Sequence, residues 1–175
     1  MIKPIVLYGN KILRQPCLPY NTVTQTDELV QDLWDTMYNA NGVGLATPQI
    51  GVEFRIFVID LPDEKWKEVF INPRIIEYSG DDVIVDEACL SIPSMSAIVS
   101  RKDTIKIEWY DEYWTSHVEE FSGLKARVIQ HEYDHLDGIL YVDRTNIKYN
   151  IQMITSLQKL QRRDLDDMHI KYPVI

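Results

Sequence analysis

The sequence predicts an α+β fold in which antiparallel strands wrap around one central helix, with an N-terminal and a C-terminal helix. Three observations support this class. An amphipathic helical pattern lies near the N-terminus, alternating strand-like segments fill the middle, and a later helical pattern carries two histidines one turn apart. No repeat or low-complexity linker divides the chain. We therefore expect a single domain over residues 1–175, with the C-terminal helix and tail at about 146–175.

The individual elements follow from hydrophobic periodicity. A first helix is expected over residues 26–41, where apolar residues recur at helical spacing and Gly42 can end the helix. Residues 42–51, rich in glycine, are expected to form a loop. The expected strands cover residues 54–60, 68–71, 82–86, 105–110 and 114–121. The last helix is expected at about 146–162, with an apolar stripe of Ile147, Ile151, Ile154, Leu157 and Leu160.

Composition argues against several classes of protein. The net charge is -9 and no block of lysine and arginine stands out, so direct binding of nucleic acid is not expected. No stretch has the length and hydrophobicity of a signal peptide or a membrane span, so no membrane partner is expected. Two cysteines without a targeting segment favour a reducing, cytoplasmic setting.

The most informative motif is His-Glu-x-x-His at residues 131–135, within a helix expected over 122–136. Each residue of a helix turns the side chain by about 100°, so His131 and His135 share one face, as ligands of one metal ion must. Glu132 lies beside that face, where its carboxylate can reach a water bound to the metal. The motif alone does not exclude two ordinary core histidines, because it also occurs by chance.

The surroundings of the motif favour the metal site. Ser122 can cap the start of the helix, and Gly138 can end it. Leu124 and Val128 begin the stripe that the two histidines continue, so both imidazoles are expected to point into the core or a cleft. Buried imidazoles need polar partners, and one metal ion would serve both.

A catalytic metal site usually has three protein ligands and one open position. Tyr141 stands where one class of metallopeptidase has its third histidine, and no glutamate follows Glu132 to serve as in another class. Cys89 is the better third ligand, although by itself it could be a core thiol like Cys17. Less suitable downstream alternatives are Asp143, Asp164, Asp166, Asp167 and His169.

Three motifs in order connect these residues to a known family. Residues 42–49 read Gly-Val-Gly-Leu-Ala-Thr-Pro-Gln, residues 87–91 read Glu-Ala-Cys-Leu-Ser, and residues 130–135 read Gln-His-Glu-Tyr-Asp-His. From about residue 4 to 143 the chain resembles the peptide deformylases. That family has a glycine-rich motif ending in glutamine, a Glu-Gly-Cys-Leu-Ser motif and a His-Glu-x-x-Asp-His motif. Three motifs in order are far more specific than any one of them.

The resemblance implies a metal-dependent hydrolase that removes the formyl group from N-formyl-methionyl peptides and releases formate. Glu132 would be the general base, and the Gln49 amide and the Leu90 backbone N–H would stabilise charge on the formyl oxygen. One divalent ion is implied, with Fe(II) favoured and Zn(II), Ni(II) or Co(II) as alternatives. The implied metal ligands are Cys89, His131 and His135.

The peptide groove is expected to use residues from all three motifs. Gly44 would let a peptide approach and pair as an added strand, although a turn glycine is an equal interpretation. Glu87 is either a strand-end carboxylate or a groove residue. The full set of expected substrate-binding residues is Val43, Gly44, Glu87, Ala88, Leu124 and Val128, of which the apolar ones could equally be core.

Three positions depart from the family pattern. Thr47 replaces a common alanine and adds a hydroxyl that needs a partner if it is buried. Ala88 replaces a common glycine. Alanine is strained at this position, by about 1 kcal/mol or more, only if φ is positive. Ser96 lies where some relatives carry an arginine.

Two alternative functions stay open on the sequence alone. One is a metallopeptidase that cuts internal bonds. The other is a deformylase-like protein that binds metal or peptide with slow or no turnover. A further expectation is a contact between the C-terminal helix and the ribosome.

Overall fold

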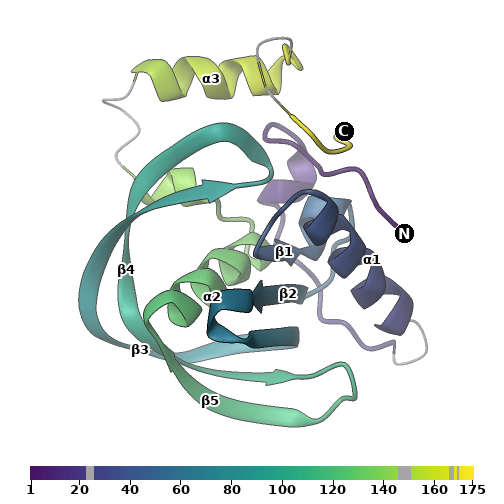
Figure 1. Ribbon diagram of the computed structural model, residues 1–175, viewed down its shortest axis with the longest axis vertical. Helices are drawn as coiled ribbons and strands as arrows, with labels where there is room; N and C mark the ends of the chain where they lie inside the picture. The colour runs from purple at the N-terminus through teal and green to yellow at the C-terminus, as the bar shows by residue number, and fades with distance from the viewer. Residues whose placement is uncertain (23–25, 146–150, 166–167, 169) are drawn as a thin grey trace.

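A five-stranded antiparallel sheet curves around one helix in the computed structural model, which describes residues 1–22, 26–145, 151–165, 168 and 170–175 (Figure 1). The strands pair in chain order, each with the next. They are β1 (Gly44–Ala46), β2 (Ile56–Leu61), β3 (Trp66–Cys89), β4 (Ile92–Tyr110) and β5 (Ser116–Ser122). The enclosed helix is α2 (Gly123–Leu136). The predicted α+β class, with antiparallel strands around a central helix, is confirmed.

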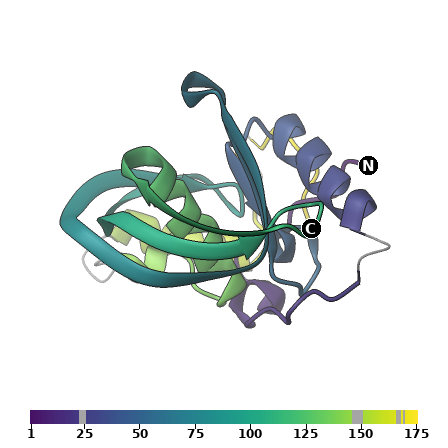
Figure 2. The same ribbon diagram turned by 90° about the horizontal axis from the view of Figure 1, so that it is seen from below.

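The two long strands β3 and β4 bend because their pairing is interrupted by register shifts. One shift lies between Ile71 and Arg74, where Asn72 adopts a φ of 49° and its side chain bonds both the N–H and the carbonyl of Tyr20 at 2.7 Å. Another follows Ser79, next to Gly80 with its φ of 71°. Figure 2 shows β3, β4 and β5 curving around α2. The expected strands at 68–71 and 82–86 are therefore parts of one strand.

The helices differ from the expected ranges at their ends. Helix α1 (Thr26–Asn39) stops before Asn41, which has a φ of 56°. Ser122 occupies the N-cap position of α2, but its side chain makes no capping hydrogen bond, so the predicted cap is wrong. Gly138, with a φ of 72°, follows the end of α2 as predicted. Helix α3 (Ile151–Gln161) is the expected last helix, the one predicted from its apolar stripe. Its expected start at 146–150, including Ile147, lies outside the described residues.

The expected loop at 42–51 is more ordered than predicted. It contains the short strand β1 and a 3-10 helix, Thr47–Ile50. Three residues of strand are too few to show an alternating pattern, which is why the sequence did not indicate it. The short strand places the glycine-rich motif against β2, beside α2.

The core forms on both faces of β2. Phe57 and Ile59 pack in the cluster that includes Ile129 of α2, whereas Ile56 and Val58 pack in the cluster that includes α1. Alternation along the strand separates the two clusters, so β2 is buried on both sides. A third cluster joins α3 to the N-terminal segment, β4 and Cys89. None of the described helices has the length and hydrophobicity needed to cross a membrane.

Candidate metal centre

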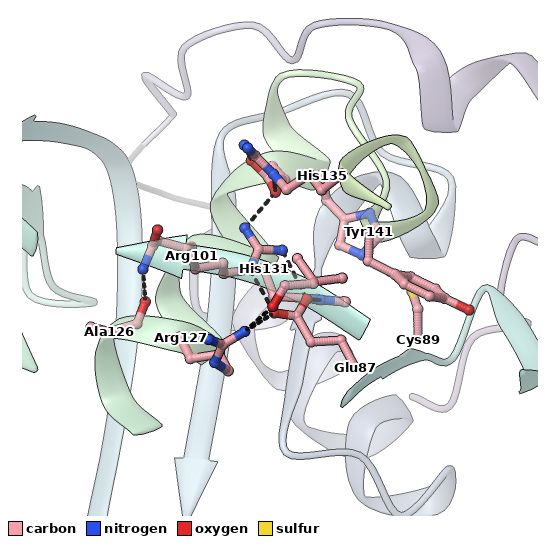
Figure 3. Close-up of polar contacts among 12 residues, drawn as sticks. Glu87, Cys89, Arg101, Ala126, Arg127, His131, His135 and Tyr141 are labelled. Atoms are coloured by element: carbon pink, nitrogen blue, oxygen red, sulfur yellow. Dashed lines mark hydrogen bonds and ion pairs between the residues drawn. The ribbon is translucent and has the colours of Figure 1, made fainter. Parts of the chain in front are cut away.

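Three ligand atoms converge where α2 passes the turn between β3 and β4. One atom from each of Cys89, His131 and His135 lies within 4.8 Å of the others. Cys89 Sγ is 3.3 Å from Nε2 of His135, and the two imidazole rings are 5.2 Å apart, one helical turn from each other. Figure 3 shows Cys89 from the sheet facing the two histidines of the helix. The structure thus brings together the three residues that the sequence combined as ligands.

The other proposed third ligands are engaged elsewhere or lie apart. Asp143 forms an ion pair with Arg14 and accepts a hydrogen bond from the Leu140 N–H at 2.8 Å. Asp164 is exposed and follows shortly after the end of α3 (Ile151–Gln161). Asp166, Asp167 and His169 lie outside the described residues.

The cluster fits a divalent metal ion on two observations. First, a thiol and two imidazoles are the donors that borderline divalent ions prefer. Second, Oε2 of Glu132 is buried beside them and has no hydrogen-bond partner among the described residues. A buried carboxylate oxygen without a partner costs free energy. An ion with a bound water would provide that partner.

The charges inside the site set the protonation of the two histidines and favour the binding of a cation. Burial, together with the positive charges of His131 and Arg101, lowers the pKa of His135 well below 6.5, so this imidazole is neutral. Burial lowers the pKa of His131 too, but hydrogen bonds to Cys89 and Glu87 outweigh it and raise that pKa to about 10. The site therefore attracts positive charge, and a divalent ion can take the place of the His131 proton.

Glu132 combines burial with a pKa near neutrality. Burial is the main cause that raises the pKa of Glu132 to about 7, against the lowering effect of His131 and Arg101. A carboxylate with such a pKa can both take up and return a proton near neutral pH. Gly44 makes room for it, because a Cβ at Gly44 would lie 2.4 Å from Oε1 of Glu132. The sequence had suggested only a peptide approach or a turn for this glycine.

Gln49 and Leu90 border the same centre. Oε1 of Gln49 accepts a hydrogen bond from the Ala46 N–H at 2.8 Å, which turns the amide nitrogen toward the thiol. That nitrogen donates to Ser91 Oγ at 3.2 Å and lies 3.5 Å from Cys89 Sγ. Leu90 and Ser91 form the tight turn that joins β3 to β4. The Gln49 amide and the Leu90–Ser91 turn thus both lie next to Cys89, the candidate metal ligand on β3.

A buried ion network holds one of the candidate metal ligands, His131. Glu87 accepts a hydrogen bond from His131 Nδ1 at 3.0 Å, two from Arg101 at 2.6 and 2.9 Å, and one from Arg127 at 2.8 Å. Figure 3 shows these side chains converging on the Glu87 carboxylate. Burial opposes ionisation, but the bonds from His131 and Arg101 hold the pKa of Glu87 well below its usual range. Glu87 is therefore ionised and fixes the orientation of His131.

The network continues through Arg101 to Asp134 on α2 at 2.8 Å, and from Asp134 to Arg144. Sequence reasoning missed these partners. A signal was present, because Ala97, Val99 and Arg101 alternate on the inward face of β4, and an arginine at an inward position needs a buried acid.

A cavity of about 700 Å³ opens onto the candidate centre. All six expected substrate-binding residues line it: Val43, Gly44, Glu87, Ala88, Leu124 and Val128. Val43 and Leu124 are about half exposed, at 49% and 52%, so the core interpretation is wrong for these two. Glu87 lines the cavity and also supports His131. Tyr172, which the sequence did not indicate, forms part of the wall.

The departures from the family pattern are accommodated. The Thr47 hydroxyl donates to the Phe54 carbonyl and lies 3.2 Å from the Ile56 carbonyl, so it is not left without a partner. Ala88 does not have a positive φ, so alanine is not strained there. Ser96 is exposed at the cavity edge and pairs with Ala88 across the two strands.

Comparison with known proteins identifies the family. The sequence model described as polypeptide deformylase matches residues 2–150. The chain is 46% identical to a peptide deformylase of Christiangramia forsetii over 82% of each chain, and 40% identical to one of Cytophaga hutchinsonii over 99% of each. The chain belongs to the polypeptide deformylase family. This deformylase is an enzyme, a metal-dependent hydrolase, and the family assignment does not favour the inactive alternative.

Solved structures agree with the fold of this deformylase. The peptide deformylase of Thermus thermophilus has a TM-score of 0.86 and 36% identity, covering 93% of this chain and 99% of the other. The one from Legionella pneumophila has a TM-score of 0.86 and 34% identity, covering 95% and 99%. A third, from Synechococcus elongatus in complex with actinonin, has a TM-score of 0.83 and 35% identity, covering 90% and 85%.

Proposed function

We propose that this deformylase hydrolyses the formyl group of N-formyl-methionyl peptides in the cytoplasm and that Fe(II) is its working metal. One observation carries the proposal: the buried carboxylate of Glu132 stands without a partner among the described residues beside a thiol and two imidazoles, where a 700 Å³ cavity reaches them. Residues 1–175 would act as one catalytic domain.

Cys89, His131 and His135 would hold the ion, with the cysteine as thiolate and the histidines neutral. When bound, such an ion supplies an activated water near neutral pH and polarises a carbonyl oxygen. Glu87 keeps Nδ1 of His131 occupied, so the other nitrogen of that ring faces the cluster. A thiolate with two imidazoles suits Fe(II) as well as Zn(II), Ni(II) or Co(II), and the family resemblance favours Fe(II).

Glu132 would take the proton from the attacking water and return it to the leaving amine. Its position in the fold suits both steps, because the carboxylate is buried, lies next to His131 in the chain and has one oxygen free of partners among the described residues. Its raised pKa of about 7 leaves it able to exchange a proton near neutral pH. Formate and a peptide with a free amine would be the products.

The formyl oxygen gains negative charge during the reaction and needs hydrogen-bond donors already in place. The side-chain amide of Gln49 and the backbone N–H of Leu90 would serve. The amide of Gln49 is held by its bond from Ala46 and directed at the Cys89 sulfur. The Leu90 carbonyl accepts a hydrogen bond from the Tyr172 hydroxyl and the Ser91 carbonyl accepts one from the Tyr8 N–H, and the Leu90 N–H would donate to the substrate.

The peptide would bind along β1. This strand pairs only with β2 among the described strands and is the edge of the sheet, so its other side can accept an added strand. Gly44 on β1 lies against Glu132, so a peptide paired there would reach the base. The exposed Val43 and Leu124 and the buried Val128 line the cavity and would contact the methionine side chain.

A ribosome contact through α3 is part of the same proposal. Met153, Leu157 and Leu160 are buried against the body, which leaves Gln152 and Gln158 on the exposed face. Arg162 and Arg163 are exposed just after the helix and would face an acidic surface of the ribosome. Sedimentation with ribosomes at low salt tests this. Binding should weaken when both arginines are changed to glutamate, and unchanged binding contradicts the contact.

The activity is tested by loading the protein with Fe(II) without oxygen and measuring formate release from formyl-Met-Ala-Ser. Glu132→Ala should lose about 10²- to 10⁴-fold in rate and keep its metal. Cys89→Ala should lose the metal itself. Glu108→Ala, which alters an exposed carboxylate on β4, is the control and should behave like the parent. Full activity in metal-loaded Glu132→Ala would contradict the role of Glu132.

A further inference from the structure

The end of the chain returns to the metal centre after α3. Residues 173–175 run parallel to residues 5–7 and are bonded to them: the Ile5 N–H donates to the Pro173 carbonyl at 2.7 Å, and the Ile175 N–H to the Ile5 carbonyl at 3.0 Å. Figure 1 shows the C-terminus beside the N-terminal segment. This ladder fixes Tyr172, whose ring lines the cavity and whose hydroxyl donates to the Leu90 carbonyl at 2.7 Å.

We propose that Tyr172 is a positioning residue for deformylation, because it holds the turn at Leu90 that follows the metal ligand Cys89. The inference rests on the proposed role of the Leu90 N–H. The matched region of the family ends at residue 150, so Tyr172 lies outside it.

The turn is held from two sides by segments far away in sequence. The Ser91 carbonyl accepts a hydrogen bond from the Tyr8 N–H at 2.8 Å, while the Leu90 carbonyl accepts from Tyr172. The two bonds restrain the peptide groups on either side of Ser91. The Leu90 N–H belongs to the preceding peptide group and shares the Leu90 Cα with the restrained one. Loss of the tyrosine bond would free rotation at Leu90 and misdirect its N–H.

The same N-terminal segment also reaches the glycine-rich motif. The Val6 N–H donates to the Gln49 carbonyl at 2.8 Å, two residues before Tyr8 binds Ser91. Both segments that carry the proposed donors to the formyl oxygen are therefore hydrogen-bonded to residues 5–8. Residues 173–175 pair with the same N-terminal segment. Tyr172 is the tail residue that contacts the turn directly through its side chain.

The test compares Tyr172→Phe, which removes only the hydroxyl, with the parent in the metal-loaded full chain. We expect kcat for formyl-Met-Ala-Ser to fall about three- to tenfold, the range for one lost hydrogen bond, with KM within about twofold. Metal content should stay unchanged, and Tm should fall by no more than about 2–4 °C. Amide hydrogen exchange of the turn at 89–91 should rise about fivefold, the effect of one lost hydrogen bond on a local opening equilibrium, and this readout does not depend on catalysis.

Two control variants separate positioning from general loosening. Val174→Ala weakens the packing of the tail but does not touch Leu90, and Tyr113→Phe removes a hydroxyl from a side chain that is 81% exposed. Both should keep the parental kcat and the parental exchange at 89–91. Unchanged kcat or unchanged exchange in Tyr172→Phe overturns the inference, as does an equal loss in Val174→Ala. Absent formate release by the parent would contradict the proposed function instead, while the exchange result would still decide the position of the turn.

Discussion

Nδ1 of His131 on α2 donates a hydrogen bond to Oε2 of Glu87 on β3 over 3.0 Å. The same carboxylate also binds Arg101 and Arg127, so one buried acid connects a candidate metal ligand to two arginines. Orientation of a metal-binding histidine by such a partner affects the affinity of the site for its ion. A carboxylate on the sheet thereby orients a histidine on the helix.

Glu87→Ala should lower metal affinity by about 10- to 100-fold, because His131 loses the partner that orients it. It should also lower the free energy of unfolding by about 3–5 kcal/mol, because buried Arg127 loses its carboxylate partner and buried Arg101 keeps only that of Asp134. Chelator competition measures the first effect and denaturant unfolding the second. Glu108→Ala breaks an exposed pair with Arg74 and should leave the free energy of unfolding nearly unchanged. Equal effects of the two substitutions would contradict the buried network.

Gly44→Ala should inactivate the enzyme without removing the metal. The added methyl would lie 2.4 Å from Oε1 and 2.8 Å from Cδ of Glu132, so the carboxylate must move away from the position from which it can accept a proton. We expect at least about a 100-fold loss in kcat, the contribution of a positioned general base. Metal content should match that of the parent. Normal kcat would mean that Glu132 acts from a different position.

Ala88→Gly should not speed the reaction, although glycine is the common residue at this position in the family. Ala88 does not have a positive φ, so its methyl causes no backbone strain that glycine would relieve. The added backbone freedom should instead lower stability by about 0.5–1 kcal/mol. Steady-state kinetics and thermal unfolding test this. A large gain in kcat/KM would show that the methyl obstructs the peptide.

His117→Gln should reduce stability at acidic pH and have little effect at alkaline pH. Nε2 of His117 is 2.9 Å from Asp111, which raises the pKa of His117 above 6.5, with smaller support from Glu68 and Glu119. The stabilisation is therefore complete below pH 6.5 and disappears as the pH rises through the raised pKa. The pair is partly exposed, so the effect should stay under about 1 kcal/mol.

Thermal unfolding of parent and His117→Gln at pH 5.5 and 9 measures this difference. Burial opposes ionisation of Asp111, but the bond to His117 and the backbone N–H groups of Thr115 and Tyr113 together outweigh it. They lower the pKa of this carboxyl, which keeps it charged at the more acidic of the two pH values. A Tm difference between parent and His117→Gln that grows toward pH 9 would contradict an ion pair between His117 and Asp111.

Local sequence patterns predicted the helix that carries the two candidate histidine ligands, because i and i+4 positions share a face whatever the rest of the fold. Cys89 was different. Its place beside His135 depends on β3 crossing α2, with a separation of 46 residues between the two ligands, and only the family motifs indicated it. The long strands were predicted as fragments, because register shifts at Asn72 and Gly80 interrupt the alternation of side chains.

The ion network and the tail were beyond prediction for a related reason. Arg101 meets Asp134 across 33 residues, and Tyr172 meets Leu90 across 82. Such contacts depend on the register of strands and on the path of the chain after α3, which no local pattern encodes. Only the inward position of Arg101 on β4 gave a signal that a buried acid must lie nearby.

The pairing of residues 5–7 with 173–175 has a consequence for the order of folding. Each strand of the sheet pairs with its neighbour in the chain, so the meander can form from nearby segments, whereas the terminal ladder must close a loop of nearly the whole chain. Contacts of such separation form slowly because the entropy of loop closure opposes them. The sheet and α2 would assemble first, and the Leu90 turn would gain its tyrosine partner last. In refolding experiments, recovery of enzymatic rate should therefore lag behind recovery of the helical circular dichroism signal.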